Sequence, residues 1–377
     1  MASVRRFLGD HTLARHLAGA LVAALVLVAV TSSLEPFRAY QLATAAAYLC
    51  ATAGLTMLVG LTGQLSLGHG ALMAIGAYTC ALTSTRLSDS GVSGPALVLA
   101  PLVSGVLAAA LAGALVGVAA ARLRGPYLAG LTLAVTISVP AFATTFADVL
   151  GGDQGISTVV EPAPEALGPD FPLERWQAWI CCLAALLTVL VVANLTSGGF
   201  GRDMRAVRDD PVAARLSGID VQRTKVVAFI VSAATAGLAG GLLAVITQAV
   251  SPGAYGLELS LFLVMAVVVG GLGHLAGAVW GALLLVALPA VATSVTDALE
   301  LSPELAQRLD GNLALLLFGL VLVVVSILMP RGIQGALSAA AHRFTALSSS
   351  RRLPAVRPAP PAPLAEDRAV HTIKSSE

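Results

Sequence analysis

Residues 96–121 read ALVLAPLVSGVLAAALAGALVGVAAA and contain no charged side chain. An apolar run of about 20 residues is long enough to cross a bilayer as a helix. A helix is favoured because it satisfies its own backbone hydrogen bonds within lipid. This run therefore predicts a membrane-spanning helix and indicates the fold class of the chain.

The composition of the whole chain agrees with that class. Of its 377 residues, 57% are hydrophobic and 11% are charged, and the mean hydropathy is +0.86. Soluble domains carry about 25% charged residues. We expect an all-α integral membrane protein. The net charge of +1 gives no indication of nucleic-acid binding, and none of the four cysteines has the C-x-x-C spacing of a metal or redox site.

Further apolar runs between charged or Pro/Gly breaks predict the remaining spans. We expect about ten transmembrane helices, the first of them an uncleaved helix rather than a signal peptide. Besides 96–121, the predicted spans are 17–34, 39–61, 64–85, 127–149, 177–195, 225–249, two within 259–295, and 312–329.

The charge of the loops predicts the orientation of the spans. Basic residues concentrate in short cytoplasmic loops. Arg5, Arg6 and Arg15 place residues 1–16 in the cytoplasm, and five arginines place the 198–224 loop there. Residues 150–176 carry five acidic residues against one arginine, so we expect them to form the largest external loop.

The long apolar region 259–295 contains either one span or two. As one helix its 37 residues would measure about 55 Å, too long for a hydrocarbon core of about 30 Å. One span would also make the basic segment from Arg331 external. Two crossings with a turn between Gly271 and His274 put both termini in the cytoplasm.

Two features of this topology remain open to interpretation. The turns near Thr62 and Gly273 carry no charge, so either could be a broken or re-entrant helix. We take residues 17–335 as the transmembrane domain. Residues 336–377 form an Arg-, Pro- and Ser-rich cytoplasmic tail, which we expect to be disordered.

Small residues recur at every fourth position in three of the spans. This spacing lets membrane helices approach closely. Packing within one bundle and an interface between subunits are both open interpretations. The three series are Gly105, Ala109, Gly113 and Gly117; Ala233, Gly237 and Gly241; and Gly273, Gly277 and Gly281.

The interiors of the spans hold almost no ionisable side chains. Ion-coupled carriers keep such groups within the membrane for their function. The chain therefore lacks an ion-coupling site, and any driving force comes from elsewhere or transport is passive. A membrane enzyme would need acids or histidines clustered at one membrane depth, and the sequence has no such cluster.

The predicted cytoplasmic loop 198–224 contains a short helix. Asp210 can cap a helix that begins at Pro211, where the missing N–H is not needed. Gly218 suits the left-handed residue that ends a helix. An isolated helix of two turns is marginal in water, so we expect this one to pack against another element.

The same loop carries the first of several resemblances. Ala213 and Ala214, followed by Gly218, resemble the E-A-A-x-x-x-G signature of bacterial ABC-importer permeases, with Val212 in place of the Glu. Five further segments resemble, in order, the high-affinity branched-chain amino acid permeases, and the M-type subunit most closely. They are residues 60–71 (GLTGQLSLGHGA), 76–78 (GAY), 124–133 (RGPYLAGLTL), 268–273 (VVGGLG) and 330–332 (PRG).

This resemblance implies an ABC-importer permease bundle in the bacterial plasma membrane. Its expected partners are a second permease subunit, two cytoplasmic ATPases and an extracytoplasmic substrate-binding protein. A P-loop is missing because neither Lys225 nor Lys374 follows a glycine. ATP must therefore bind to the partner, and we expect no cofactor, metal or enzymatic step on this chain. The residues expected to dock the ATPase are Arg205, Arg208, Asp210, Pro211, Ala213, Ala214, Arg215 and Gly218.

The polar, glycine-rich block 62–70 is the candidate for pathway lining or for a broken helix beside the pathway. Its candidate residues are Thr62, Gly63, Gln64, Ser66 and His69, for which a structural role is an equal alternative. By resemblance, branched-chain amino acids lead as substrates, and related systems carry other amino acids, urea or short amides. An ion-coupled secondary carrier for a small polar solute is the alternative from another class.

Overall fold

A computed structural model describes Thr31 and residues 34–123, 126–168, 171–298, 303–329 and 331–349. The chain divides into two compact units, residues 1–336 and 337–377. The predicted segment 1–16, and all of the predicted span 17–34 except Thr31 and Leu34, lie outside the described residues.

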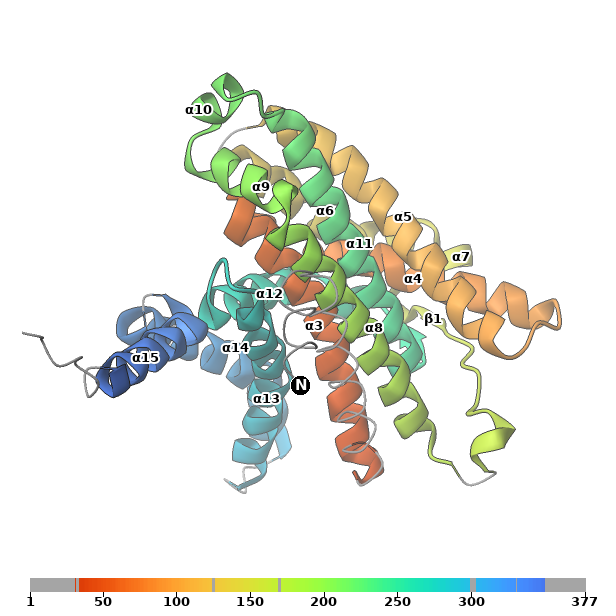
Figure 1. Ribbon diagram of the computed structural model, residues 1–377. Helices are drawn as coiled ribbons and strands as arrows, with labels where there is room; N and C mark the ends of the chain where they lie inside the picture. Colours follow the sequence, from red (N-terminus) through yellow and green to blue (C-terminus); the bar gives the residue numbers. More distant parts are fainter. Residues whose placement is uncertain are drawn as a thin grey trace, which may run out of the picture. The chain divides into compact units, whose positions relative to one another are not determined.

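Long helices coincide with each predicted span from 39–61 onward (Figure 1). In the described part of the chain, seven helices are long and apolar enough to cross a membrane; α4 and α14 do not meet that criterion. The long helices are α3 (Pro36–Thr62), α4 (His69–Asp89), α5 (Pro95–Arg122), α6 (Pro126–Thr145), α8 (Leu173–Ser197), α11 (Val221–Thr247), α12 (Leu257–Gly270), α13 (Leu275–Ala298) and α14 (Pro303–Leu328).

The region 259–295 forms two helices. α12 ends at Gly270 and α13 begins at Leu275. Gly271 and Gly273 have φ angles of 120° and 84°, which glycine adopts without strain. The predicted turn between Gly271 and His274 is therefore present.

Short elements connect the long helices. They are α7 (Ala147–Leu150), η1 (Gly152–Gln154), β1 (Ile156–Ser157), η2 (Glu165–Leu167), α9 (Gly199–Asp209), α10 (Pro211–Leu216), β2 (Ala249–Val250) and η3 (Pro252–Tyr255). β1 and β2 pair antiparallel, with Ile156 opposite Val250. This pairing holds the 150–176 loop at the same end of the bundle as the end of α11.

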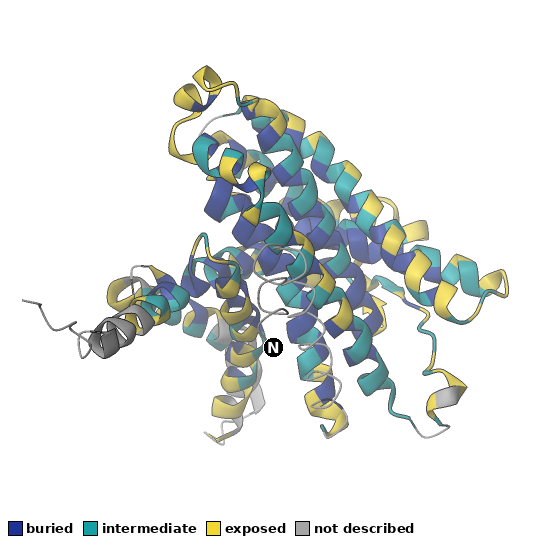
Figure 2. Ribbon diagram, viewed as in Figure 1, coloured by how far each residue is buried: buried dark blue, intermediate teal, exposed yellow. Residues whose placement is uncertain are grey.

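α11 and α3 form the centre of the bundle, and they are the most buried of the seven helices. α11 packs against α5, α4 and α3, and α3 packs against α8. In Figure 2 the buried colour follows α3 and α11, whereas α10 at one end is almost wholly exposed.

The small residues of α5 and α11 pack against each other within this chain. A Cβ atom added at Gly113 would meet the Ala233 side chain, and one added at Gly237 would meet Ala109. α4 joins this crossing, because a Cβ atom at Gly76 would meet the backbone of Gly237. The Gly277 and Gly281 series packs α13 against α12. The structure therefore assigns all three series to packing within the bundle.

The beginning of the predicted tail differs from expectation. α15 (Gly332–Ser349) continues the helical structure through residues 336–349, for which the sequence analysis predicts disorder. Three alanines in succession, residues 339–341, explain this difference, because alanine has the highest helix propensity. Residues 350–377 lie outside the described residues.

Replacing Gly76 by valine tests the crossing of α4, α5 and α11. We expect the solubilised protein to lose about 1–3 kcal/mol of stability, because the added side chain would overlap the backbone of Gly237. Thermal unfolding followed by size-exclusion chromatography measures the loss. Gly130→Val on α6 is the matched control, since a Cβ atom there meets nothing within 4 Å. Equal melting temperatures of the two variants would contradict the described packing.

Candidate docking and pathway site

The loop between α8 and α11 folds into two short helices at one end of the bundle (Figure 1). α9 buries Gly201, Met204 and Val207 and leaves its opposite side in contact with solvent. A Cβ atom at Gly201 would meet the Thr196 carbonyl, so glycine is required where α9 turns back over the end of α8. The loop is therefore an ordered element.

α10 begins and ends where the sequence predicts. The Asp210 carboxylate accepts hydrogen bonds from the backbone N–H groups of Val212 (2.8 Å) and Ala213 (3.1 Å), and Pro211 is the first helical residue. At the other end Gly218 has a φ of 83° and donates to the Arg215 carbonyl, while Ile219 donates to the Ala214 carbonyl. These two bonds form a Schellman motif.

α10 packs through a single face. Ala214 is buried with Val207 and Val221 in a small apolar cluster, separate from the main core, that joins α9, α10 and α11. On the outer side Val212 is 67% and Leu216 is 86% exposed. Two large apolar side chains on so short an exposed helix favour contact with a partner protein.

The three predicted docking arginines occupy different environments. The Arg208 guanidinium donates to the Gly60 carbonyl near the end of α3 (2.7 Å), and the Arg205 guanidinium donates to the Thr196 carbonyl (3.2 Å). Arg215 lies on the exposed side of α10. Arg205 and Arg208 therefore attach α9 to the bundle, which leaves Arg215 as the outward-facing member.

The candidate pathway block, residues 62–70, begins next to the hydrogen bond between Arg208 and Gly60. α3 ends at Thr62, residues 63–68 are not helical, and α4 begins at His69. The Gln64 amide donates to the Lys225 carbonyl, whereas His69 Nε2 shares a hydrogen bond with the Ser232 hydroxyl (2.8 Å). Lys225 and Ser232 lie about 10 Å apart along α11. The segment therefore descends into the bundle, and its turn is a broken helix.

Protein groups satisfy the backbone of this buried segment. The Leu67 N–H donates to the Thr132 hydroxyl (3.0 Å) and the Leu67 carbonyl accepts from the Thr136 hydroxyl (2.8 Å). The Gly68 N–H donates to the Ser66 hydroxyl (3.3 Å). Non-helical backbone at membrane depth is tolerated only where protein or a water-filled cavity surrounds it, and α6 supplies that surrounding here.

A second connection, residues 248–256 with β2 and η3, approaches the first from the opposite end of the bundle. α11 ends at Thr247, about 22 Å beyond Ser232, and residues 248–256 lead back to α12. The Gly70 N–H donates to the Ser260 hydroxyl (2.9 Å), and a Cβ atom at Gly70 would meet the carbonyls of Tyr255 and Gly256. The first turns of α4 and α12 thus meet inside the bundle.

The predicted pathway residues divide by exposure. Ser66 and His69 are fully buried and form hydrogen bonds. Thr62 and Gln64 are almost fully buried, and they also form side-chain hydrogen bonds. Gly63 is exposed, with a φ of 68° that suits glycine. Leu65, which the sequence analysis does not select, is 43% exposed. The polar residues hold the broken helix in place within this chain, and its open side consists of Gly63 and Leu65.

The sequence analysis also does not select several other residues of the site. The buried positions 201, 204 and 207 recur at helical spacing, and this pattern could have predicted α9. By contrast, the contacts of Thr132, Thr136, Ser232 and Ser260 with the 62–70 block join segments between 65 and 190 residues apart, and nothing in the local sequence marks them.

Residues 37–326 match the protein family described as branched-chain amino acid transport system / permease component. The high-affinity branched-chain amino acid transport system permease protein LivM of Escherichia coli is 32% identical, over 76% of this chain and 67% of the relative. LivH of the same organism is 26% identical, and BraD of Pseudomonas aeruginosa 27%, each over 76% of this chain and 91% of the relative. No solved structure matches.

The family match and the long apolar helices make this a multi-pass protein of the bacterial plasma membrane. The matched region contains the crossing of α4, α5 and α11, the broken segment 63–68, and the helices α9 and α10. The chain belongs to the family of permease components of branched-chain amino acid transport systems.

Proposed function

We propose that this chain is the permease subunit of an ATP-driven importer of branched-chain amino acids. The second permease subunit, two cytoplasmic ATPases and an external binding protein complete the transporter. The observation that carries the proposal is the docking element: α10 presents Val212, Arg215 and Leu216 outward, while Arg208 of α9 binds the end of α3.

Energy must reach the pathway from another chain. Within the described residues no Asp or Glu side chain is buried, so those residues offer no carboxylate for ion coupling. The sequence contains no P-loop. We infer that the ATPases supply the energy through α10. The names of the relatives, which are M-type and H-type permeases of branched-chain amino acid systems, support the substrate and the second permease subunit.

The hydrogen bond between Arg208 and Gly60 offers a route for the movement. Gly60 lies two residues before the end of α3, where the broken segment starts. A displacement of α9 by a docked ATPase would therefore displace the beginning of residues 63–68. Such a movement biases the bundle between its outward-open and inward-open arrangements.

Ten spans with both termini in the cytoplasm fit this function. Three turns on the predicted cytoplasmic side lie together, since Arg208 contacts Gly60 and Gly60 packs against Gly273. Gly332 packs against Gly271 at the same end. At the other end the Gly94 N–H donates to the Glu161 carboxylate of the predicted external loop (2.6 Å).

Changing Leu216 to aspartate tests the docking face. We expect at least a tenfold loss of co-purified ATPase with the bundle still folded, because an exposed apolar anchor at an interface is replaced by a charge. Leu167→Asp is the control, because Leu167 is also exposed and lies in the loop at the opposite end. Unchanged ATPase capture by Leu216→Asp would refute docking through α10.

Changing Arg208 to glutamine tests the transmission of movement. ATPase capture should stay within about threefold of wild type, while ATP-driven uptake of leucine in proteoliposomes should fall about tenfold, because a charge-assisted hydrogen bond to α3 is lost. Arg202→Gln makes the same change on the exposed side of α9 and should retain uptake. Normal uptake by Arg208→Gln would exclude this route.

Cysteine labelling tests whether the broken helix borders an aqueous pathway. In the assembled transporter, Leu65→Cys should react with a membrane-impermeant maleimide, because Leu65 lies on the open side of the segment. Ser66→Cys should remain unreactive, since Ser66 is fully buried. The four native cysteines are buried and give little background. An unreactive Leu65→Cys would mean that lipid or the partner subunit covers this side.

A further inference from the structure

A groove of about 310 Å³ lies between the end of α5 and the start of α11. Arg122, the last residue of α5, and Arg223, in the first turn of α11, both line it. Within the last two turns of α5 the helices are still in contact, because a Cβ atom added at Gly117 would meet the Phe229 side chain (3.2 Å). The groove therefore lies where the two helices end, close to α10, which packs against α11.

The polar side chains of the groove favour a ligand with a negative charge. Arg122 and Arg223 are exposed, and within the described residues no carboxylate pairs with either guanidinium. The Asp220 carboxylate also lines the groove, where it accepts from the Arg223 N–H (3.0 Å) at the positive end of the α11 dipole. Gln222 adds an exposed amide. Two guanidinium groups and one carboxylate leave a net positive charge, which an anionic ligand complements.

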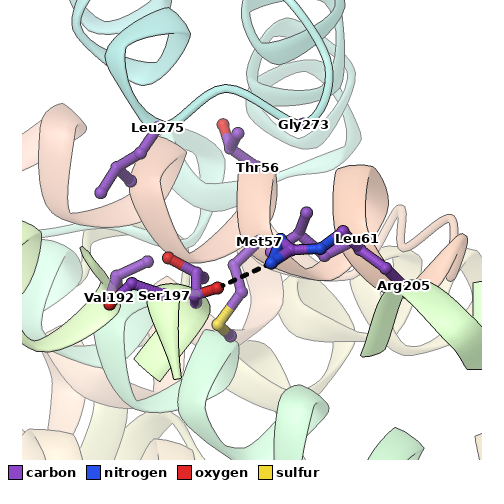
Figure 3. Close-up of a pocket in the computed structure, with 9 residues that line it drawn as sticks. Thr56, Met57, Leu61, Val192, Ser197, Arg205, Gly273 and Leu275 are labelled. Atoms are coloured by element: carbon purple, nitrogen blue, oxygen red, sulfur yellow. Dashed lines mark hydrogen bonds between the residues drawn. The ribbon is translucent and has the colours of Figure 1, made fainter. Parts of the chain in front are cut away.

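The environment of Arg205, at the same end of the bundle, is different. Its guanidinium donates to the Thr196 carbonyl (3.2 Å) beside a second cavity, as the dashed line in Figure 3 shows. Met57 and Val192 line that cavity and are almost fully buried, so they offer a ligand little surface. The groove between α5 and α11 is the better candidate for a binding site, because all of its polar side chains are exposed.

An apolar surface continues from the groove along α5. The apolar part of the groove consists of Val118, Ala121, Val226 and Val227. Leu107, Leu111 and Leu115 extend the same exposed face, since a spacing of four residues brings side chains to one side of a helix. α5 is long and apolar enough to cross a membrane. An arginine at the end of such a helix lies at the membrane surface, and the leucines lie at the depth of the acyl chains.

We propose that this groove binds an anionic glycerophospholipid. The phosphate pairs with Arg122 and Arg223, and an acyl chain follows the exposed leucines of α5. Basic pockets between membrane helices on the cytoplasmic side bind anionic headgroups in other proteins. The bound lipid joins the end of α5 to the start of α11. Its assignment to the cytoplasmic leaflet rests on the proposed function, whereas binding itself does not.

Native mass spectrometry of the full chain, titrated with phosphatidylglycerol or with phosphatidylcholine, tests the assignment. We expect the first phosphatidylglycerol to bind about tenfold more tightly than phosphatidylcholine, which carries no net charge. Arg122→Gln and Arg223→Gln should each weaken phosphatidylglycerol binding about fivefold, because each removes one arginine next to an anionic headgroup. The double variant should bind the two lipids equally. Both arginines are exposed, so the variants should elute as wild type in size-exclusion chromatography.

Arg86→Gln is the matched control, with wild-type affinity expected, because Arg86 is an exposed arginine in the last turn of another long helix, α4. Equal affinities of the wild-type chain for the two lipids would overturn the proposal, as would a double variant that still prefers phosphatidylglycerol. Displacement of the lipid by glycerol 3-phosphate would overturn it in favour of a soluble anion, and displacement by the second permease subunit in favour of a subunit interface. The titration of the chain alone needs no ATPase, so a failure of the proposed function is distinguished.

Discussion

The rest of the structure depends on the hydrogen bonds that satisfy the non-helical backbone of residues 63–68. A membrane interior offers this backbone no water, so protein groups must bond it. Thr132 and Thr136 of α6 do so directly, and His69, through Ser66 and Ser232, fixes the segment against α11. These hydroxyl groups within otherwise apolar spans thus have a structural purpose.

Close helix packing makes this arrangement possible. Glycines at the crossing of α4, α5 and α11 remove the side chains that would separate the helices. The first turns of α4 and α12 can then meet in the interior, with Gly70 bonded to Ser260. The docking element contacts the same assembly through Gly60, one helical turn from the broken segment. Because this contact joins α9 directly to the end of α3, a movement of α9 can be transmitted to residues 63–68 without a flexible hinge elsewhere in the bundle.

Local features of the sequence predicted local structure well. Asp210, Pro211 and Gly218 predicted α10 because each acts on backbone groups within a few residues. Charge parity and length predicted the turn after Gly270. The hydrogen bond from Arg208 to Gly60 and the pairing of β1 with β2 could not be predicted, because each depends on a contact across the fold. The disorder predicted from composition is wrong for residues 336–349, which form an alanine-rich helix before the Pro-rich segment.

We propose that ATP binding on the partner moves the broken helix through α9. The most direct test of this movement is the electron paramagnetic resonance spectrum of a nitroxide label at position 65 in the assembled transporter, recorded with and without ATP. We expect ATP to change the mobility of the label in the otherwise wild-type chain, and we expect the change to disappear when Arg208 is replaced by glutamine. An identical spectrum with and without ATP, while the ATPase remains bound, would contradict the account.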